Sequence, residues 1–334
     1  MFDETVNIAE HIMTNYIDLH IHSKYSGDGE FTVSQLMEKC QEAGITIMSI
    51  TDHDSAKANV TAKAIAKDYH IHYITGIEID CTFKGMNLHL LGYGFDETSP
   101  DFEALEEHIW AEERNASLGR IDLTGQLGFE ITKEELNEVS NLEEGGIWTG
   151  EVFAEVLLEK PEYQKHELLL PYRKGGARGD NPMVNFYWDY YSQGKPCYVH
   201  LDFPSLEDAL LMIHRNGGKA VLAHPGNNLK GRLGLRNLLE HSKLLVGSRS
   251  IVDKADSIKE LKDLGLDGIE VFCSYHNEEM ARLLYELATE LDLLITCGSD
   301  YHGKTKPAVK LGEYYSSIPL KELEAEFILK GLLK

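Results

Sequence analysis

Histidine and carboxylate side chains gather at the ends of the apolar stretches from which β-strands are expected. A lone histidine at a strand end is most often structural, and two histidines at i and i+2 point to the same side of a strand. Convergence at several separate strand ends is much harder to obtain by chance. A mixed nitrogen and oxygen ligand set suits Zn, Mn or Fe. A transition-metal site is therefore predicted from His20, His22, Asp52, His53, Asp54, Glu78, His89, His224, Asp300 and His302.

The elements that must position these residues alternate between strand and helix. Helical periodicity follows most of the strand-like stretches, which are residues 16–23, 45–54, 70–80, 88–95, 219–225, 267–273 and 293–300. Repeated strand–helix units imply an α/β fold with a parallel sheet, open or closed into a barrel. In such folds the working residues sit at the carboxyl ends of the strands, where the histidines and carboxylates occur.

Charged helical segments interrupt this alternation in the middle of the chain. We expect a first part of a barrel over residues 14–100, a helical insertion or cap over 101–203, and the second part of the barrel over 204–334. The five cysteines are scattered, with no C-x-x-C pair, so buried free thiols are expected instead of disulfides or a thiolate zinc site.

Composition narrows the classes of function. The formal net charge of -23 repels polyanions, which disfavours a long nucleic-acid duplex held on a broad basic face. No stretch approaches the roughly 20 consecutive apolar residues that span a bilayer, so no membrane partner is expected. The first residues are acidic and lack the apolar segment of a signal peptide, which makes a cytoplasmic location the expectation.

The stretch GSDYHGKT, residues 298–305, has two readings. It matches G-x-x-x-x-G-K-[ST], the phosphate-cradling loop of nucleotide triphosphatases. That loop must begin a helix, so that backbone N–H groups and the helix dipole face the phosphate. Here Lys306 and Pro307 follow, which is a poor helix start. We therefore read the stretch as a metal-binding strand end, and a P-loop nucleotide-binding module is disfavoured.

Seven short motifs together resemble the PHP (polymerase and histidinol phosphatase) family of metal-dependent phosphoesterases. In family order they are DLHIHS (18–23), SGDG (26–29), TDHD (51–54), GIE (76–78), LHLLGY (88–93), AHP (223–225) and GSDYHG (298–303). Within the family the chain looks most like the stand-alone nucleotide-phosphatase branch, whose insertion also separates LHLLGY from AHP. The resemblance implies a distorted seven-stranded (β/α) barrel with a trinuclear metal centre.

Carried over position by position, the resemblance implies ligands for each metal. One would be held by His20, His22, Glu78 and Asp300, a second by the bridging Glu78 with His89 and His224, and a third by Asp28, His53 and His302. Asp18 and Asp52 would fix the tautomers of ligand histidines from behind. The expected cofactors are about two to three divalent or trivalent transition-metal ions, Zn, Mn or Fe.

Such a centre implies hydrolysis of phosphate esters. A water that bridges two cations can have its pKa lowered from about 16 toward about 7, and we assign the attacking hydroxide to the pair joined by Glu78. The leading hypothesis is hydrolysis of phosphate monoesters of nucleotides or similar small phosphorylated metabolites. The alternative is a phosphodiesterase acting on cyclic phosphate esters or short oligonucleotide ends. Asp54 is a candidate for the acid that protonates the leaving group.

Contacts to the substrate are expected from the insertion, which leaves after the strand bearing His89 and returns before the strand bearing His224. Because those two residues would bind one metal, the insertion should begin and end beside the site and cover it as a cap. Candidate phosphate contacts are Arg178 and Lys195 in the insertion, together with Ser274 and His276 just beyond another strand end. Arg178 is preferred, since a guanidinium pairs with phosphate through two hydrogen bonds. The expected partner is a small phosphorylated substrate such as a nucleotide, and the oligomeric state is left open.

Overall fold

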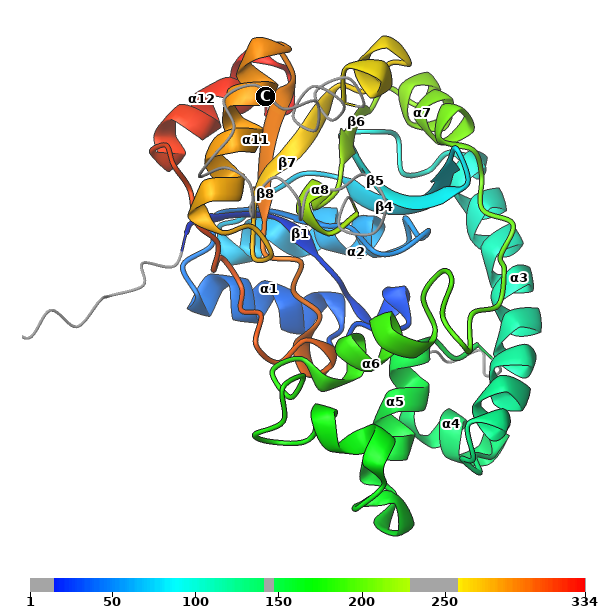
Figure 1. Cartoon of the computed structure of the whole chain (residues 1–334). Coiled ribbons are helices and arrows are strands. Elements are labelled where there is room, and N and C mark those ends of the chain that lie inside the picture. The colour runs from blue at the N-terminus through cyan, green and yellow to red at the C-terminus, as the bar shows by residue number, and fades with distance from the viewer. Residues whose placement is uncertain (1–14, 141–146, 229–257, 334) are drawn as a thin grey trace, which may run out of the picture.

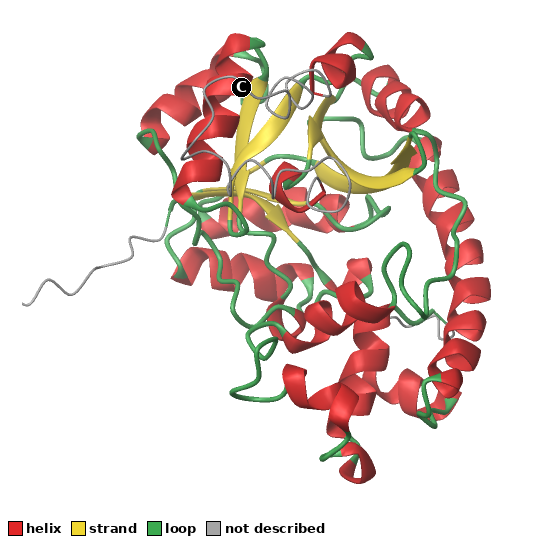
Figure 2. Cartoon of the chain, in the orientation of Figure 1, coloured by secondary structure: helices red, strands yellow, loops and turns green. Residues whose placement is uncertain are grey.

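The strands form two sheets in the computed structural model, which describes residues 15–140, 147–228 and 258–333. The first sheet is parallel, in the order β1 (Ile17–Ile21), β2 (Ile47–Ile50) and β3 (His72–Tyr73). The second has the order β4 (Gly76–Phe83), β5 (Met86–Tyr93), β6 (Lys219–Leu222), β7 (Gly268–Cys273) and β8 (Leu294–Gly298). The strands lie together in the upper half of Figure 2, and the lower half holds helices and loops.

Backbone hydrogen bonds join the two sheets on both sides. On one side His22 N donates to Tyr301 O over 2.9 Å and Asp300 N donates to His20 O over 2.8 Å. On the other side Glu78 N donates to Asp52 O over 3.1 Å. Predicted ligand residues thus lie at the seams between the sheets. The α/β class is confirmed, while a single closed barrel of seven strands stays a prediction.

A hairpin departs from the expected parallel order. Lys84 and Gly85 both have positive φ, 49° and 76°, as a two-residue turn between antiparallel strands requires. β4 and β5 pair antiparallel along their whole length, and β6 pairs antiparallel with β5. The expectation of an all-parallel sheet is therefore wrong for β4, β5 and β6. The hairpin register places Asp80 directly across from His89.

Helices cover the outer faces of the sheets. α1 and α2 pack beside β1 and β2, and α7, α11 and α12 pack on the five-stranded sheet (Figure 1). The helices around the sheets are α1 (Val33–Glu42), α2 (Ala58–Ile65), α7 (Leu206–Arg215), the short α8 (Pro225–Asn228), α11 (Glu278–Glu290) and α12 (Leu320–Leu329). Within the described residues, no helix is long and apolar enough to cross a membrane.

The insertion has a hydrophobic cluster of its own. The helices of the insertion are α3 (Pro100–Gln126), α4 (Lys133–Val139), α5 (Gly150–Glu159) and α6 (Pro182–Tyr190). α3 runs along the side of the molecule from the sheets to the other three helices (Figure 1). Large buried side chains of this cluster include Trp148, Phe153 and Phe186. Because burying a side chain of this size contributes about 1.5–3 kcal/mol, the cluster can hold the insertion helices together.

All five cysteines are buried and free, in agreement with the sequence-based expectation.

Candidate metal centre

Three groups of metal-ligating side chains face one another in the described part of the chain. In each group the ligand atoms lie within 4.8 Å of one another. The groups share members and so form one continuous cluster. They are His20, His22, Glu78 and Asp300; His22, Asp28, His53 and His302; and His53, Glu78 and His89.

The first group is fully buried and surrounds a common point. Glu78 Oε2 lies 3.0 Å from His20 Nε2 and 3.1 Å from His22 Nε2. The two imidazole nitrogens are only 3.1 Å apart, and Asp300 Oδ1 lies 3.4 and 3.3 Å from them. Two imidazoles and two carboxylates that converge in this way form a ligand set suited to Zn, Mn or Fe.

Buried polar atoms without hydrogen-bond partners indicate that cations fit this cluster. Buried polar atoms are hydrogen-bonded in the large majority of cases, and a cation provides an alternative partner for lone pairs. The unpartnered atoms of the cluster are Asp28 Oδ1, His53 Nδ1, Asp80 Oδ1, His224 Nδ1, Asp300 Oδ1 and His302 Nε2.

The charge states of two residues agree with a ligand role. Burial would raise the pKa of Glu78, but the neighbouring His20, His53 and His89 rings hold it well below its usual value. Burial and the His302 ring lower the pKa of His22 to about 3. Glu78 is therefore an anion and His22 a neutral imidazole, the forms in which these side chains bind metals.

Of the other two groups, one shares Glu78 and the other contains Asp28 and His302. Glu78 Oε1 lies 2.9 Å from both His89 Nδ1 and His224 Nε2. His302 Nε2 lies 3.2 Å from Asp28 Oδ2. The structure thus brings together all nine ligand residues that the sequence predicts. It adds His22 to the residues around Asp28, and His53 to those around Glu78 and His89.

Asp80 is a member of the cluster that the sequence prediction missed. Its Oδ1 lies 3.3 Å from His53 Nδ1 and 3.4 Å from His89 Nε2. The available signal was its position two residues after Glu78, because residues at i and i+2 share one face of a strand.

Hydrogen bonds behind the cluster orient the histidine rings. Glu270 Oε1 accepts from His20 Nδ1 over 2.9 Å, and the Asp300 carbonyl accepts from His302 Nδ1 over 2.9 Å. Ser26 Oγ lies 2.7 Å from His22 Nδ1 and donates to Asp52 Oδ1, so it accepts from the ring. Each of these bonds places the proton on Nδ1 and leaves Nε2 for a metal.

The predicted roles of Asp18 and Asp52 need correction. Asp18 accepts from backbone N–H groups of His20, Ser299 and Gly312, and among the described residues no hydrogen bond joins its carboxylate to a ring. Asp52 accepts from Ser23 and Ser26, so it reaches His22 only through Ser26. Glu270 and Ser26 contact the rings directly, and the sequence prediction missed both.

Asp54 lies beside the cluster in a strained backbone conformation. Its φ is 52°, its side chain is buried, and its Oδ1 accepts from Asp80 N over 2.9 Å. Burial, and then the Asp80 carboxylate, raise the pKa of Asp54 well above its usual value. A carboxyl group that keeps its proton suits an acid, and that role for Asp54 stays a prediction.

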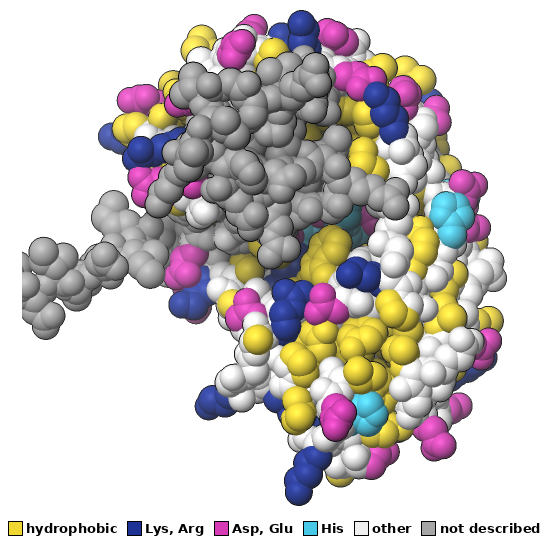
Figure 3. Space-filling view, in the orientation of Figure 1, with side chains coloured by type: hydrophobic (Ala, Val, Ile, Leu, Met, Phe, Trp, Pro, Cys, Tyr) yellow, Lys and Arg dark blue, Asp and Glu magenta, His cyan; other side chains and the backbone are white. Residues whose placement is uncertain are grey.

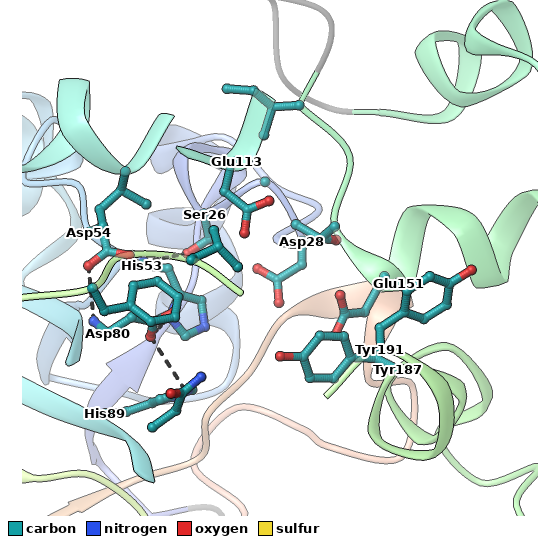
Figure 4. A pocket seen from close by; sticks show the side chains of 18 of the residues that line it. Ser26, Asp28, His53, Asp54, Asp80, His89, Glu113, Glu151, Tyr187 and Tyr191 are labelled. Atoms are coloured by element: carbon teal, nitrogen blue, oxygen red, sulfur yellow. Dashed lines mark hydrogen bonds and ion pairs between the residues drawn. The ribbon is translucent and has the colours of Figure 1, made fainter. Parts of the chain in front are cut away.

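A pocket opens from the cluster toward the insertion. Its sheet-side wall includes Asp28, His53, Asp54, Asp80 and His89. The insertion contributes Glu113, Glu151, Tyr187, Trp188 and Tyr191, among other residues. Figure 4 shows Asp28 between His53 on one side and Glu151, Tyr187 and Tyr191 on the other. In Figure 3 hydrophobic side chains gather on the lower half of the face, over the insertion helices.

The predicted phosphate contacts do not line this pocket. Arg178 donates from Nε and Nη2 to the two carboxylate oxygens of Asp189, over 3.0 and 3.1 Å. Lys195 is exposed on the surface. His276 uses both ring nitrogens on backbone groups, accepting from Gly226 N and donating to Val271 O. Arg178 and His276 are thus engaged with other groups in this structure, neither Lys195 nor Ser274 lines the pocket, and the assignment of these residues to the substrate stays a prediction.

The GKT sequence does not form a phosphate loop. Gly303–Thr305 is a single turn of 3₁₀-helix, and Lys304 Nζ is bonded to Glu155 Oε1 over 2.6 Å. A phosphate loop requires a following α-helix with its N-terminus at the phosphate. In the part of the chain that the structure describes, the next α-helix is α12, at Leu320. The reading as a strand end that carries ligands agrees with this geometry.

Known proteins similar to this chain act on phosphate esters. It is 27% identical over 289 residues to a phosphoribosyl 1,2-cyclic phosphate 1,2-diphosphodiesterase of Eggerthella lenta, covering 86% of this chain and 94% of that protein. It is 27% identical over 293 residues to a 5'-3' exoribonuclease of Haemophilus influenzae, covering 87% and 91%. It is 26% identical over 318 residues to a 3',5'-nucleoside bisphosphate phosphatase of Chromobacterium violaceum, covering 93% and 98%.

The fold and the family profile agree with these likenesses. A solved structure of an amidohydrolase from Chromobacterium violaceum superimposes with a TM-score of 0.70 at 23% identity, covering 93% of this chain and 96% of that one. The family profile described as the PHP domain matches residues 18–174, which include six of the predicted ligands. The ligand cluster, the fold and the family match lead to one conclusion. The chain carries a PHP domain and is a metal-dependent phosphoesterase.

Proposed function

We propose that this enzyme hydrolyses phosphate monoesters of nucleotides or similar small phosphorylated metabolites at a centre of three metal ions. One observation carries the proposal. Three overlapping ligand groups meet at Glu78 and His22, beside a pocket whose other wall comes from the insertion. A cluster of this size can hold several cations, and the pocket places a small substrate between them and the insertion.

The residues of each group have distinct tasks in this proposal. His20, His22, Glu78 and Asp300 would hold one ion; Glu78 with His89 and His224, next to His53 and Asp80, a second; and Asp28, His53 and His302 a third. Bound cations supply Lewis acidity, which lowers the pKa of water and neutralises charge on the transferring phosphoryl group. Glu270 and Ser26 keep the His20 and His22 rings in the tautomer that binds metal.

The insertion acts as a cap in this proposal. Trp110, Tyr187, Trp188 and Tyr191 line the pocket opposite the ligand cluster. Aromatic faces stack on nucleobases, and each stacked base contributes about 1–3 kcal/mol. The similarity to a nucleoside bisphosphate phosphatase supports a nucleotide-sized substrate. A pocket walled on two sides suits a small substrate better than a long duplex.

Hydrolysis of phosphodiesters is the second candidate. Two of the similar proteins are named for cleaving diesters, one a cyclic phosphate and the other RNA from its 5' end. The same ligand cluster would serve either reaction, because both need a nucleophile and charge neutralisation at phosphorus. The insertion wall of the pocket, rather than the metal centre, would separate the two kinds of substrate.

Protein purified without chelator is expected to contain about two to three transition-metal ions per chain, because the described residues offer three ligand groups. Elemental analysis measures this directly, and dialysis against a strong chelator should remove the metal and the activity together. Protein that is active and free of metal would contradict the proposed centre.

Nucleoside monophosphates are expected to be hydrolysed faster than cyclic phosphates, short oligonucleotides or duplex DNA. Trp188→Ala should raise KM for a nucleoside monophosphate about tenfold, since it removes a ring that is 39% exposed and lines the pocket. KM for a substrate without a base, such as β-glycerophosphate, should stay unchanged. Leu211→Ala is the matched control, because Leu211 is 57% exposed on α7, outside the pocket. A clear preference for RNA ends or cyclic phosphates would favour the second candidate.

A further inference from the structure

Lys306, two residues beyond the lysine of the GKT sequence, lies at the edge of the ligand cluster. Its Nζ is 2.7 Å from Asp300 Oδ2, and only 9% of its side chain is exposed. The ammonium group also lies 5.6 Å from the centre of the Tyr275 ring. A buried lysine in this position was not among the predicted site residues.

The turn after His302 places this side chain. Lys306 N donates to Gly303 O over 3.1 Å, which closes the 3₁₀ turn, and Val309 N donates to Lys306 O over 2.9 Å. Pro307 follows and prevents the turn from continuing as a regular helix. From this turn Lys306 lines the pocket together with Asp28 and Glu151.

The two carboxylate oxygens of Asp300 face different partners, one the ligand histidines and the other Lys306. Oδ1 faces His20 and His22 and has no hydrogen-bond partner, whereas Oδ2 is bonded to Lys306. The lysine ammonium thus contacts a member of the first ligand group directly. An ammonium group has three N–H donors; Asp300 uses one and the Tyr275 hydroxyl is a second partner, which leaves one donor for a substrate.

Other cations near the pocket are held by carboxylates. Arg120, which also lines the pocket, is bonded to Glu113 and to the Trp148 carbonyl. Arg178 is paired with Asp189, and Lys304 with Glu155. Lys306 differs from them because its partner is itself a member of the metal-ligand cluster. A phosphoryl group beside the metals would therefore lie within reach of this ammonium.

We propose that Lys306 binds an oxygen of the substrate's phosphoryl group at the metal centre. This role rests on the proposed function and adds to it a specific phosphate-binding residue. A lysine acts on phosphate as a compact point charge with several rotatable donors. The acidic ligands that collect around the metals make such a charge useful, since the substrate is also an anion.

The test compares two lysines that lie two positions apart. Lys306→Met is expected to raise the inhibition constant of inorganic phosphate, and KM for a phosphate monoester, on the order of 10- to 100-fold, the usual effect of losing a charge-assisted hydrogen bond. Metal content should remain that of the wild type. Lys304→Met is the matched control and should change neither constant by more than about twofold, since its partner Glu155 does not line the pocket.

Two further variants distinguish a role of Lys306 in binding phosphate from a role in holding the Asp300 carboxylate in place. Lys306→Arg keeps the charge and should recover part of the affinity for inorganic phosphate. Lys306→Gln keeps a polar side chain of similar length and replaces the methionine variant if that variant does not fold. Wild-type affinity for phosphate in metal-loaded Lys306→Gln or Lys306→Met, or a loss of metal that alone accounts for the lost activity, would overturn the role of Lys306. Failure of the wild type to hydrolyse any monoester would instead overturn the proposed function.

Discussion

Glu78→Gln is expected to lower kcat/KM on a phosphate ester on the order of 10³-fold or more. Both carboxylate oxygens are used in the structure: Oε2 faces His20 and His22, and Oε1 faces His89 and His224. Glutamine fills the same space but replaces one oxygen with an NH₂ group, which cannot bind a metal. The substitution therefore removes a ligand shared by two groups and should also reduce the metal content by at least one ion per chain.

Glu270→Gln is the matched control for this substitution. Glu270 is equally buried on β7 of the same sheet and contacts the His20 ring, but it belongs to none of the ligand groups. Loss of such an orienting contact typically costs about 10- to 100-fold in metal affinity or activity. Elemental analysis and steady-state kinetics on both variants would rank the two effects. A Glu78→Gln enzyme with full metal content and activity would contradict the assignment of Glu78.

Four of the ligand residues, His20, His22, Asp300 and His302, could be predicted because they follow local rules. A strand that ends in histidine or carboxylate delivers those groups to one end of a sheet, whichever strands become its neighbours. His20 and His22 needed only the two-residue period of a strand, and Asp300 and His302 needed only their position after β8. The α/β class followed from the same alternation of strand and helix.

The missed residues depend on contacts between distant parts of the chain. Asp80 enters the cluster because the β4–β5 hairpin register sets it across from His89. Glu270 lies in an apolar strand and meets His20, 250 positions earlier, only in the folded protein. Such pairs are fixed by tertiary packing, so a pattern along one segment does not contain them.

Arg178 illustrates a different kind of ambiguity. A guanidinium binds a carboxylate and a phosphate with the same two-pronged geometry, so its sequence context does not distinguish these partners. In the structure Asp189 on α6 accepts two hydrogen bonds from the Arg178 guanidinium, so the partner of Arg178 is a carboxylate. A cationic residue that does contact a predicted ligand, Asp300, is Lys306, and its place depends on the turn after His302.

His302→Ala and Lys304→Met are expected to differ in activity by orders of magnitude, although only one residue separates them. His302 is fully buried, its Nε2 faces Asp28, and its Nδ1 is held by the Asp300 carbonyl. Removing this imidazole deletes a ligand and leaves buried carboxylates without a cation, so kcat should fall on the order of 10²- to 10³-fold. The metal content should fall as well.

Lys304→Met should leave kcat and KM within about twofold of the wild type. The pair of Lys304 with Glu155 is partly exposed, with 34% and 17% of the side chains accessible, and such pairs contribute at most about 1 kcal/mol to stability. In a phosphate loop the same lysine would contact the nucleotide phosphates, and its loss would abolish turnover. Steady-state kinetics with a phosphate monoester, and separately with ATP, distinguishes the two readings. Equal loss of activity in both variants, together with ATP hydrolysis by the wild type, would restore the phosphate loop, because only that site makes Lys304 as necessary as His302.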